Sequence, residues 1–228
     1  GSVRAGTDAA GSWNRDGNVT FSFSPSETWQ ISIGPEYART FSQAQYVTAV
    51  GDPLATATYG RRYVFAGIDQ TTLAIEARLN VTFTPTLSLE MYAQPFISSG
   101  QYGTLKELAA PRTFDFTKYG EDVGTLTQQA DGYYRVDPDG GGPADSFEVR
   151  DLDFNVRSLL GNAVLRWEWR PGSTLYLVWQ QRRSREVTGM DLEEAPVGEF
   201  EFGHDTRALF DLSADNIFAI KLSYWLNP

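Results

Sequence analysis

The sequence predicts an all-β fold, an antiparallel up-and-down transmembrane β-barrel with about eight strands in this chain. Three observations predict it: a strict alternation of apolar and polar residues, tight turns that alternate with long loops, and a shortage of lysine. The clearest alternation runs from Leu73 to Pro95, where odd positions are apolar and nearly all even positions are polar. Successive side chains of a strand lie on opposite faces, so this stretch predicts a hairpin with one apolar and one polar face.

The same hairpin pattern occurs around three prolines, Pro25, Pro85 and Pro171. An aromatic residue lies two positions before each proline, and an apolar residue lies four positions after it. This spacing keeps the apolar face in phase across each turn. Proline suits such a turn, because its φ is fixed and the turn needs no ladder N–H. We expect tight turns with an odd number of residues at all three places.

The alternation also places the other elements along the chain. Residues 13–16 indicate a loop or the top of a strand, and Gly34-Pro35 indicates a bulge or kink within a long strand. Helix signals are weak, and the best of them, residues 104–110, predicts one or two turns within a loop. The eight expected strands are residues 3–8, 19–23, 29–50, 63–83, 87–97, 152–169, 175–185 and 217–226.

Connections between the expected strands fall into two length classes. Tight turns lie at one end, whereas the other end carries longer connections, among them two surface loops at about 100–150 and 186–215. Short turns at one rim and long loops at the other are typical of outer-membrane barrels. We therefore expect residues 1–228 to form a single outer-membrane β-barrel domain or the C-terminal portion of one.

Composition narrows the class of protein further. The formal net charge of −10 argues against nucleic acid as a partner. No run of about 18 apolar residues occurs, so no transmembrane helix is expected. Cysteine is absent, which excludes disulfides and thiolate metal sites. The chain has 16 arginines but only three lysines, whereas soluble β-proteins commonly use lysine to protect exposed strand edges.

In the barrel interpretation, the apolar face contacts outer-membrane lipid and the polar face lines the lumen. Closure pairs every strand edge, which is required where no water reaches the backbone. An arginine on the lipid face would cost about 2–4 kcal/mol at the midplane, so charged side chains are expected inside. The lumen-facing candidates are Glu76, Arg78, Glu90, Tyr92, Arg166 and Glu168, and the interfacial aromatic candidates are Phe23, Trp29, Phe83, Trp167 and Trp169.

A soluble β-barrel or sandwich that acts as a binding module is the alternative, because periodicity alone does not say which face is wet. In that fold the apolar face would form the interior, and Arg78 and Glu90 would face bulk solvent. The scarcity of lysine, the two classes of connection and the long strands favour the membrane interpretation.

Two weaker signals lie in the long loops. The only histidine, His204, precedes Asp205, and a His oriented by a carboxylate acts as the base of many hydrolases. An outer-membrane hydrolase is therefore a remote alternative, although a solvated loop histidine is the ordinary interpretation and no enzyme is expected. Asp137, Asp139 and Asp145, with glycines between them, faintly resemble a calcium loop. No cofactor is expected beyond this weak indication of Ca²⁺.

Three segments, residues 82–96, 155–179 and 218–226, carry a resemblance to a known family. They resemble the C-terminal outer-membrane β-barrel region of a bacterial family of unknown function, whose large envelope proteins also carry an N-terminal carbohydrate-binding-like β-sandwich. The likeness covers most of the chain from about Tyr63 onward. It implies a bacterial outer-membrane location, further strands or chains that complete the barrel, and no catalytic residue. The last strand departs from the terminal signal of such barrels, because it ends in Leu226-Asn-Pro228 rather than on an aromatic residue.

Together, the pattern and the resemblance predict a porin-like protein of the Gram-negative envelope, which passes solutes or captures them at the cell surface, glycans among them. If eight strands close on themselves, the lumen has room for little but side chains, and the loops carry the function by binding. If further strands complete a wider barrel, the charged lumen candidates line a conduit.

Overall fold

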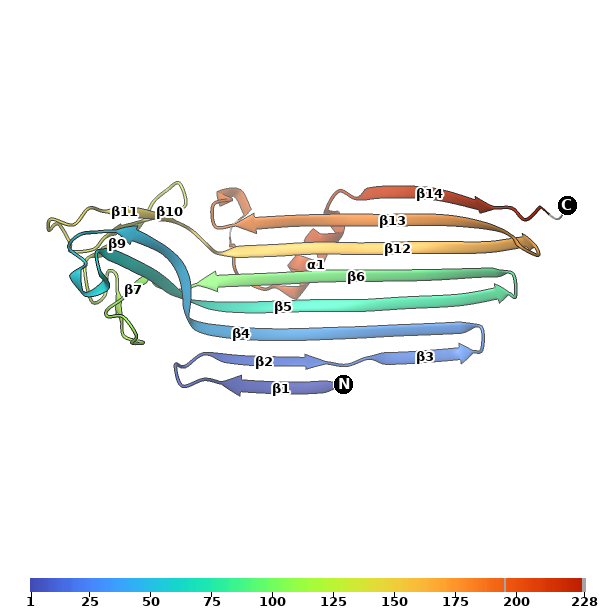
Figure 1. Cartoon of the computed structure of the whole chain (residues 1–228), viewed down its shortest axis with the longest axis horizontal. Coiled ribbons are helices and arrows are strands. Elements are labelled where there is room, and N and C mark those ends of the chain that lie inside the picture. Colours follow the sequence, from blue (N-terminus) through green and yellow to red (C-terminus); the bar gives the residue numbers. More distant parts are fainter. Residues whose placement is uncertain (195, 227–228) are drawn as a thin grey trace.

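The computed structural model describes residues 1–194 and 196–226, and its main feature is one large antiparallel sheet (Figure 1). Consecutive long strands are neighbours, as in an up-and-down meander, which confirms the all-β antiparallel prediction. In spatial order the strands are β1 (Ser2–Thr7), β2 (Trp13–Asn18), β4 (Trp29–Gly51), β5 (Arg61–Thr84), β6 (Leu87–Tyr102), β12 (Phe154–Arg170), β13 (Ser173–Thr188) and β14 (Asp215–Ser223).

The strand β3 (Phe21–Ser26) continues the line of β2, because both pair with β4 at successive places along it. The strand expected at 19–23 is therefore the second half of a broken strand whose first half is β2. Among the described residues, no pairing joins β1 to β14, which lie at opposite edges of the sheet (Figure 1). The sheet is thus open, with a free edge at each side.

Each tight turn contains two residues, so the expectation of an odd number was wrong. The strands pair across Glu27-Thr28, Pro85-Thr86 and Pro171-Gly172. A bulge in the strand before each turn supplies the extra residue that keeps the apolar positions in phase. In the first hairpin the proline itself, Pro25, lies within that bulge.

The register brings the apolar positions of neighbouring strands together on one side of the sheet, which we call the apolar face. Leu79 of β5 pairs with Met91 of β6, and Met91 is level with Trp179 of β13. The alternate positions form the opposite side, the polar face, where Arg78 pairs with Tyr92. The alternation read from the sequence therefore gives one continuous apolar surface that spans the strands.

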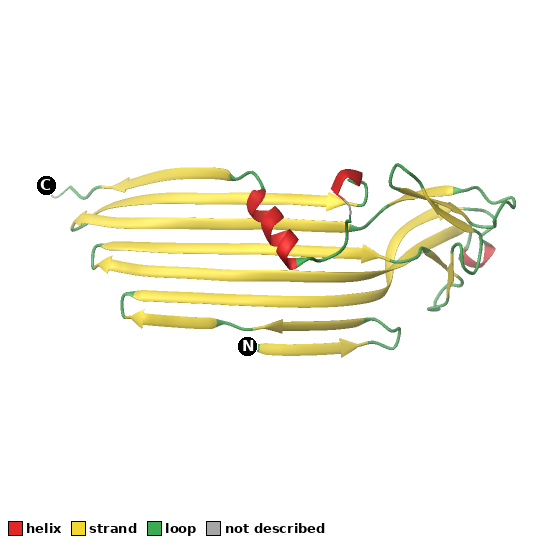
Figure 2. Ribbon diagram, turned by 180° about the vertical axis from the view of Figure 1, so that it is seen from behind, coloured by secondary structure: helices red, strands yellow, loops and turns green. Residues whose placement is uncertain are grey.

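Most of the apolar face has no cover from the described part of the chain. Ile33, Leu177 and Ile220 lie on it and are 44%, 39% and 75% exposed. The helix α1 (Phe202–Asp211) crosses this face a little beyond the middle of the sheet, toward the end away from the tight turns (Figure 2). A single sheet with an open apolar side is incomplete as a water-soluble fold, because apolar surface must be buried against another layer or solvent.

Residues 103–150 fold into a small compact unit, the head, at the end of the sheet opposite the tight turns (Figure 1). The surface loop expected at about 100–150 is thus an ordered unit, and residues 104–110, expected as a helix, contain β7 instead. The strands of the head are β7 (Lys106–Leu108), β8 (Phe116–Lys118), β9 (Thr125–Gln128), β10 (Tyr133–Asp137) and β11 (Phe147–Arg150).

The core of the head includes residues from the main sheet. Val64 and Ala66 of β5 pack with side chains of the head, among them Tyr119 and Val136. The turn η1 (Thr56–Thr58) lies in the connection between β4 and β5. The long strand β5 therefore belongs to the sheet at one end and to the core of the head at the other.

A buried ion network reinforces this attachment. Arg62 at the start of β5 lies 2.7 Å from Asp52 and 2.7 Å from Glu107 of the head. The hydroxyl of Tyr119 donates to Glu107 at 2.9 Å. Because these partners come from both parts, the network fixes the head relative to β5.

The second long loop, expected at 186–215, also contains ordered structure. It includes η2 (Leu192–Glu194) and the helix α1. Among the described residues, no helix has the length and apolar character needed to cross a membrane.

Candidate functional site

The six lumen-facing candidates all lie on the polar face, in neighbouring strands. Glu76 and Arg78 are on β5, Glu90 and Tyr92 are on β6, and the remaining two are on β12. The Arg78 guanidinium lies 2.6 Å from Glu76 and 5.3 Å from the centre of the Tyr92 ring. On β12, Arg166 pairs with Glu168 at 2.9 Å.

We call these six side chains the polar ladder. Glu76, Arg78 and Glu90 are exposed, with the Arg78 side chain 60% accessible, and the other three are half-buried. The positive and negative side chains of the ladder alternate, pair with close neighbours and are not part of a buried core. They can therefore hold polar solutes or line a water-filled space. The sequence prediction that these side chains share one face is borne out by the register, whereas their facing a lumen stays a prediction.

The five aromatic candidates lie close to the tight turns, at one end of the sheet. Phe23, Trp29 and Phe83 are 63%, 41% and 52% exposed. Trp167 and Trp169 contact each other edge to face, with ring centres 6.3 Å apart. Exposed aromatic side chains at one level are what a membrane interface would use, but their contact with an interface stays a prediction.

At the other end of the apolar face, α1 is held by a buried ion pair. Arg157 of β12 donates through Nε and Nη2 to Oδ1 of Asp205, at 2.9 Å and 2.8 Å. The other carboxylate oxygen accepts the backbone N–H of Glu201 at 2.8 Å, which satisfies a donor at the start of the helix. Leu209 then packs against Ile97 and Leu159 of the sheet, burying one stripe of α1.

The geometry of His204 gives little support to a hydrolase. Its Nδ1 lies 3.8 Å from Asp205, but that carboxylate is already bound by Arg157 and by the N–H of Glu201. The His204 side chain is 62% exposed at the mouth of a polar cavity of about 380 Å³, which Asn155 and Glu199 also line. The carboxylate beside the imidazole therefore serves to position α1.

The weak calcium candidates form a turn stabilised by backbone hydrogen bonds. Asp137 accepts the N–H groups of Asp139 and Gly140, and Asp139 accepts those of Gly142 and Ala144. Desolvation alone would raise the pKa of Asp137. The hydrogen bonds from the N–H groups of the turn together have a larger effect, so the pKa is lowered overall. These carboxylates therefore have a structural role in the turn.

The third acidic residue of the turn, Asp145, is exposed. Counted from Asp137, the twelfth residue is Glu148, the position of the last ligand in EF-hand loops. Glu148 lies in β11 and accepts a hydrogen bond from Gln129. Among the described residues, no group of three or more His, Asp or Glu side chains is arranged to hold a metal ion.

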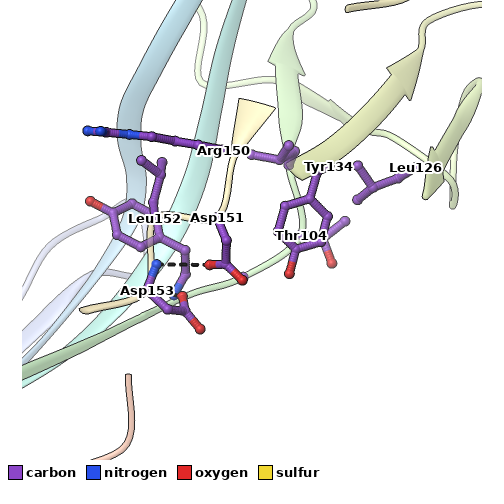
Figure 3. A pocket seen from close by; sticks show the side chains of 10 residues that line it. Thr104, Leu126, Tyr134, Arg150, Asp151, Leu152 and Asp153 are labelled. Atoms are coloured by element: carbon purple, nitrogen blue, oxygen red, sulfur yellow. Dashed lines mark hydrogen bonds between the residues drawn. The ribbon is translucent and has the colours of Figure 1, made fainter. Parts of the chain in front are cut away.

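A cavity that the sequence did not indicate lies where the head joins the sheet. Its volume is about 220 Å³, and its walls come from the end of β6, from the head and from the segment that leads into β12. Figure 3 shows the carboxylate of Asp151 between Asp153 and the ring of Tyr134, with the Arg150 guanidinium extending in another direction. Leucine side chains complete the lining.

The two aspartates of this junction cavity are placed by short backbone contacts. The N–H of Asp153 donates to Oδ1 of Asp151 at 3.0 Å, and the N–H of Tyr102 donates to Oδ1 of Asp153 at 2.6 Å. Burial raises the pKa of Asp153 to about 6; the Tyr102 N–H opposes this shift, and the charge of Asp151 adds to it. Burial and the same two carboxylates raise the pKa of Tyr134, so its phenol stays protonated.

Sequence reasoning missed this cavity because its residues are scattered over four segments. The only local signal is the run Arg150-Asp151-Leu152-Asp153, which breaks the alternation just before β12 begins. The aromatic side of the cavity depends on how the head packs, which no short-range pattern reveals.

Comparison with known proteins gives no match to a family model, a curated protein or a solved structure.

Proposed function

We propose that the chain forms the wall of a bacterial outer-membrane β-barrel, or part of it, and captures solutes at the outer rim. The apolar face contacts lipid, the tight turns lie at the inner rim, and the head lies at the outer rim. The observation that carries this proposal is the continuous apolar face, which is left exposed between the aromatic residues of the turns and the helix α1.

The height of the apolar face fits a bilayer. On β5 its apolar positions run over the 11 residues from Leu73 to Phe83. Such a segment measures about 33 Å along the strand, and about 25 Å across the membrane at a tilt of about 40°. Beyond Leu73 the same side of β5 becomes polar, with Asp69 in a 2.7 Å ion pair with Arg39.

The upper limit of the apolar face also runs obliquely across the strands. On β6 the continuous run of apolar residues ends at Ile97, whereas on β13 it ends at Trp179, which is level with Met91. The next residue on that side of β13 is Gln181. A membrane slab cuts tilted strands at such an oblique line, because strands of a barrel are inclined to its axis.

The helix α1 fits the outer interface of such a membrane. It lies on the apolar face at its upper limit, with Leu209 buried against the sheet. Phe202 and Phe210 at its two ends are exposed, together with charged neighbours. A short amphipathic helix with aromatic side chains is suited to the headgroup level.

A membrane barrel has no free strand edge, so the edges at β1 and β14 must be paired in the lipid-embedded form. They meet each other in an eight-stranded barrel, or they receive further strands from another segment or chain. The first arrangement fills the lumen with side chains and leaves capture to the head. The second makes the polar ladder a conduit, which is the second candidate function that its paired charges favour.

The position of the head favours capture at the rim. Val64 and Ala66, which form its core, have the same parity along β5 as Arg78. The head therefore packs on the end of the polar face, over the mouth of the proposed barrel. Solutes that approach the lumen would meet the head first.

The need for detergent tests the membrane proposal. We expect the purified chain to stay monodisperse only in detergent or after insertion into lipid vesicles, because its apolar face is uncovered. Size-exclusion chromatography with light scattering, with and without detergent, measures this. A monomer that stays monodisperse in plain buffer would overturn the proposal in favour of the soluble binding module. Planar-bilayer conductance then separates conduit from capture, since a silent barrel leaves the head as the functional part.

A further inference from the structure

We propose that the junction cavity binds a small organic cation, whose ammonium group lies between Asp151 and Asp153 and against the rings of Tyr102 and Tyr134. This inference goes beyond the proposed function, because it names a solute class and a site. It does not depend on which face of the sheet contacts lipid, since the cavity lies between the head and the sheet.

The first argument is an unbalanced negative charge. Asp151 is about nine-tenths buried, and within the described residues neither Asp151 nor Asp153 forms an ion pair with a cationic side chain. Their hydrogen bonds come from neutral groups: the N–H of Tyr102 donates to Asp153, and the N–H of Asp153 and the side-chain amide of Gln128 donate to Asp151. The buried Asp151 and the half-buried Asp153 disfavour joint ionisation, and a cation placed between them would relieve that repulsion.

The second argument is the chemistry of the remaining walls. Two tyrosine rings and the leucines of the cavity offer polarisable and apolar surface, which suits an alkylammonium group rather than a hydrated metal ion. A hard cation such as Ca²⁺ takes six to eight oxygen ligands, and the cavity supplies only two carboxylates. A neutral solute could accept donors from the tyrosines but would leave both carboxylates without a counter-charge.

Arg150 contributes a positive charge to the lining of the cavity. It belongs to the lining, but its guanidinium points away from the carboxylates in Figure 3. Its charge opposes the effect of Asp153 on the pKa of Tyr102, which places it within electrostatic reach of the phenol. A cation in the cavity therefore has a like charge nearby, on Arg150.

The raised pKa of Asp153 gives the site a pH dependence with a definite sign. A cation binds the ionised carboxylate, so affinity is highest above a pH of about 6 and falls as Asp153 takes up its proton. The other titratable or charged groups that line the cavity around Asp153 are Asp151, Tyr102, Tyr134 and Arg150. Of these, the tyrosines stay protonated through this range because burial raises the pKa of each.

Calorimetric titration with choline tests the proposal, in whichever medium keeps the chain monodisperse. The matched neutral probe is 3,3-dimethyl-1-butanol, which has the shape of choline without its charge. We expect saturable binding of choline, at least about tenfold weaker binding of the alcohol, and loss of choline affinity between pH 7 and pH 5. Equal binding of both probes, no binding of either, or tighter binding of Ca²⁺ than of choline would overturn the proposal.

Two variants localise the binding. Asp153→Asn removes one charge without changing size, and we expect about a tenfold loss of choline affinity together with loss of the pH dependence. Tyr134→Leu should weaken binding, whereas Tyr134→Phe should retain it, because the ring and not the hydroxyl contacts the cation. Asp145→Asn makes the same charge change at an exposed place in the head and is the control.

Arg150→Gln is expected to change choline affinity in the direction opposite to Asp153→Asn. Removing the positive charge of Arg150 from the cavity lining should tighten choline binding, whereas a misfolded head would lose choline binding. Full affinity in the Asp153→Asn variant, with the head intact by circular dichroism, would place choline elsewhere and contradict the assignment.

Discussion

The two ends of the same long strands differ in how they are covered. At the head end, the polar face packs into a core with Val64 and Ala66, and the apolar face is covered by α1. At the turn end, much of both faces is open, and side chains such as Ile33 and Trp167 are 44% and 47% exposed. The strands are continuous between these ends, so the difference lies in their surroundings and not in their secondary structure.

This difference indicates which solvent each end requires. The head end buries an apolar core and an ion network within the chain, as a water-soluble domain does. The turn end exposes a continuous apolar surface that nothing in the described chain covers, which is acceptable only against lipid or a partner layer. The chain thus combines a head with its own core and a sheet face that depends on its surroundings.

The largest effect is expected at the ion pair that anchors α1. Asp205→Ala leaves the buried Arg157 without a counter-charge, which should cost about 3–5 kcal/mol of the free energy of unfolding and release α1 from the sheet. Chemical unfolding and hydrogen exchange of residues 202–211 measure both effects. Asp211→Ala, at an exposed position in the same helix, should be nearly silent. Equal effects of the two variants would show that α1 is not held through Arg157.

The second largest effect is expected when an arginine is placed on the apolar face and not at a neighbouring position on the polar face. Leu79→Arg places a charge on the apolar face near mid-height, and we expect a loss of about 2–4 kcal/mol in folding into lipid vesicles. The neighbouring Asn80→Arg places the same residue on the polar face and should change folding far less. Equilibrium refolding into vesicles measures both. A larger loss for Asn80→Arg would reverse the assignment of the faces.

A smaller effect with a distinct pH profile is expected at the junction cavity. The pKa of Asp153 is raised from 3.8 to about 6, so the folded state binds more protons than the unfolded state between these values, and stability falls as pH rises through that interval. Asp153→Asn removes this loss and should stabilise the chain by about 1–2 kcal/mol at pH 8, a value reduced for partial exposure. The gain should vanish below a pH of about 4. Thermal unfolding across pH measures it, and a variant that is destabilised at pH 8 would contradict this account.

The smallest effect is expected on the polar ladder. Arg78 and Glu76 form an exposed pair, so Arg78→Ala should change the free energy of unfolding by less than about 1 kcal/mol. A double-mutant cycle with Glu76→Ala measures their coupling. A coupling well above 2 kcal/mol would mean that the polar face is a closed interior and not a wetted surface.

The long strands could be predicted from the sequence because a period of two over ten or more residues leaves little choice of structure. Residues 73–83 and 87–97 were therefore correctly predicted as strands, with alternate side chains on opposite sides of the sheet. The head was missed because its strands contain only three to five residues, too short for the alternation to be recognised.

The helix α1 was missed for a different reason. Its N-cap position is Glu201, which gives no side-chain cap, and Gly203 follows in the first turn. The start of the helix depends on Asp205, whose carboxylate accepts the N–H of Glu201 only because Arg157 of a distant strand holds it there. The junction cavity likewise depends on contacts between segments far apart in the sequence, so no local pattern indicates it.

The most direct test of the membrane account is lipid quenching of Trp179. This residue lies on the apolar face, level with Met91, and stacks on Phe218. In a variant that keeps Trp179 as its only tryptophan, vesicles of lipid brominated along the acyl chains should quench most of its fluorescence. Fluorescence that brominated lipid leaves unchanged, in a folded and vesicle-associated chain, would place Trp179 in a protein interior and contradict the account.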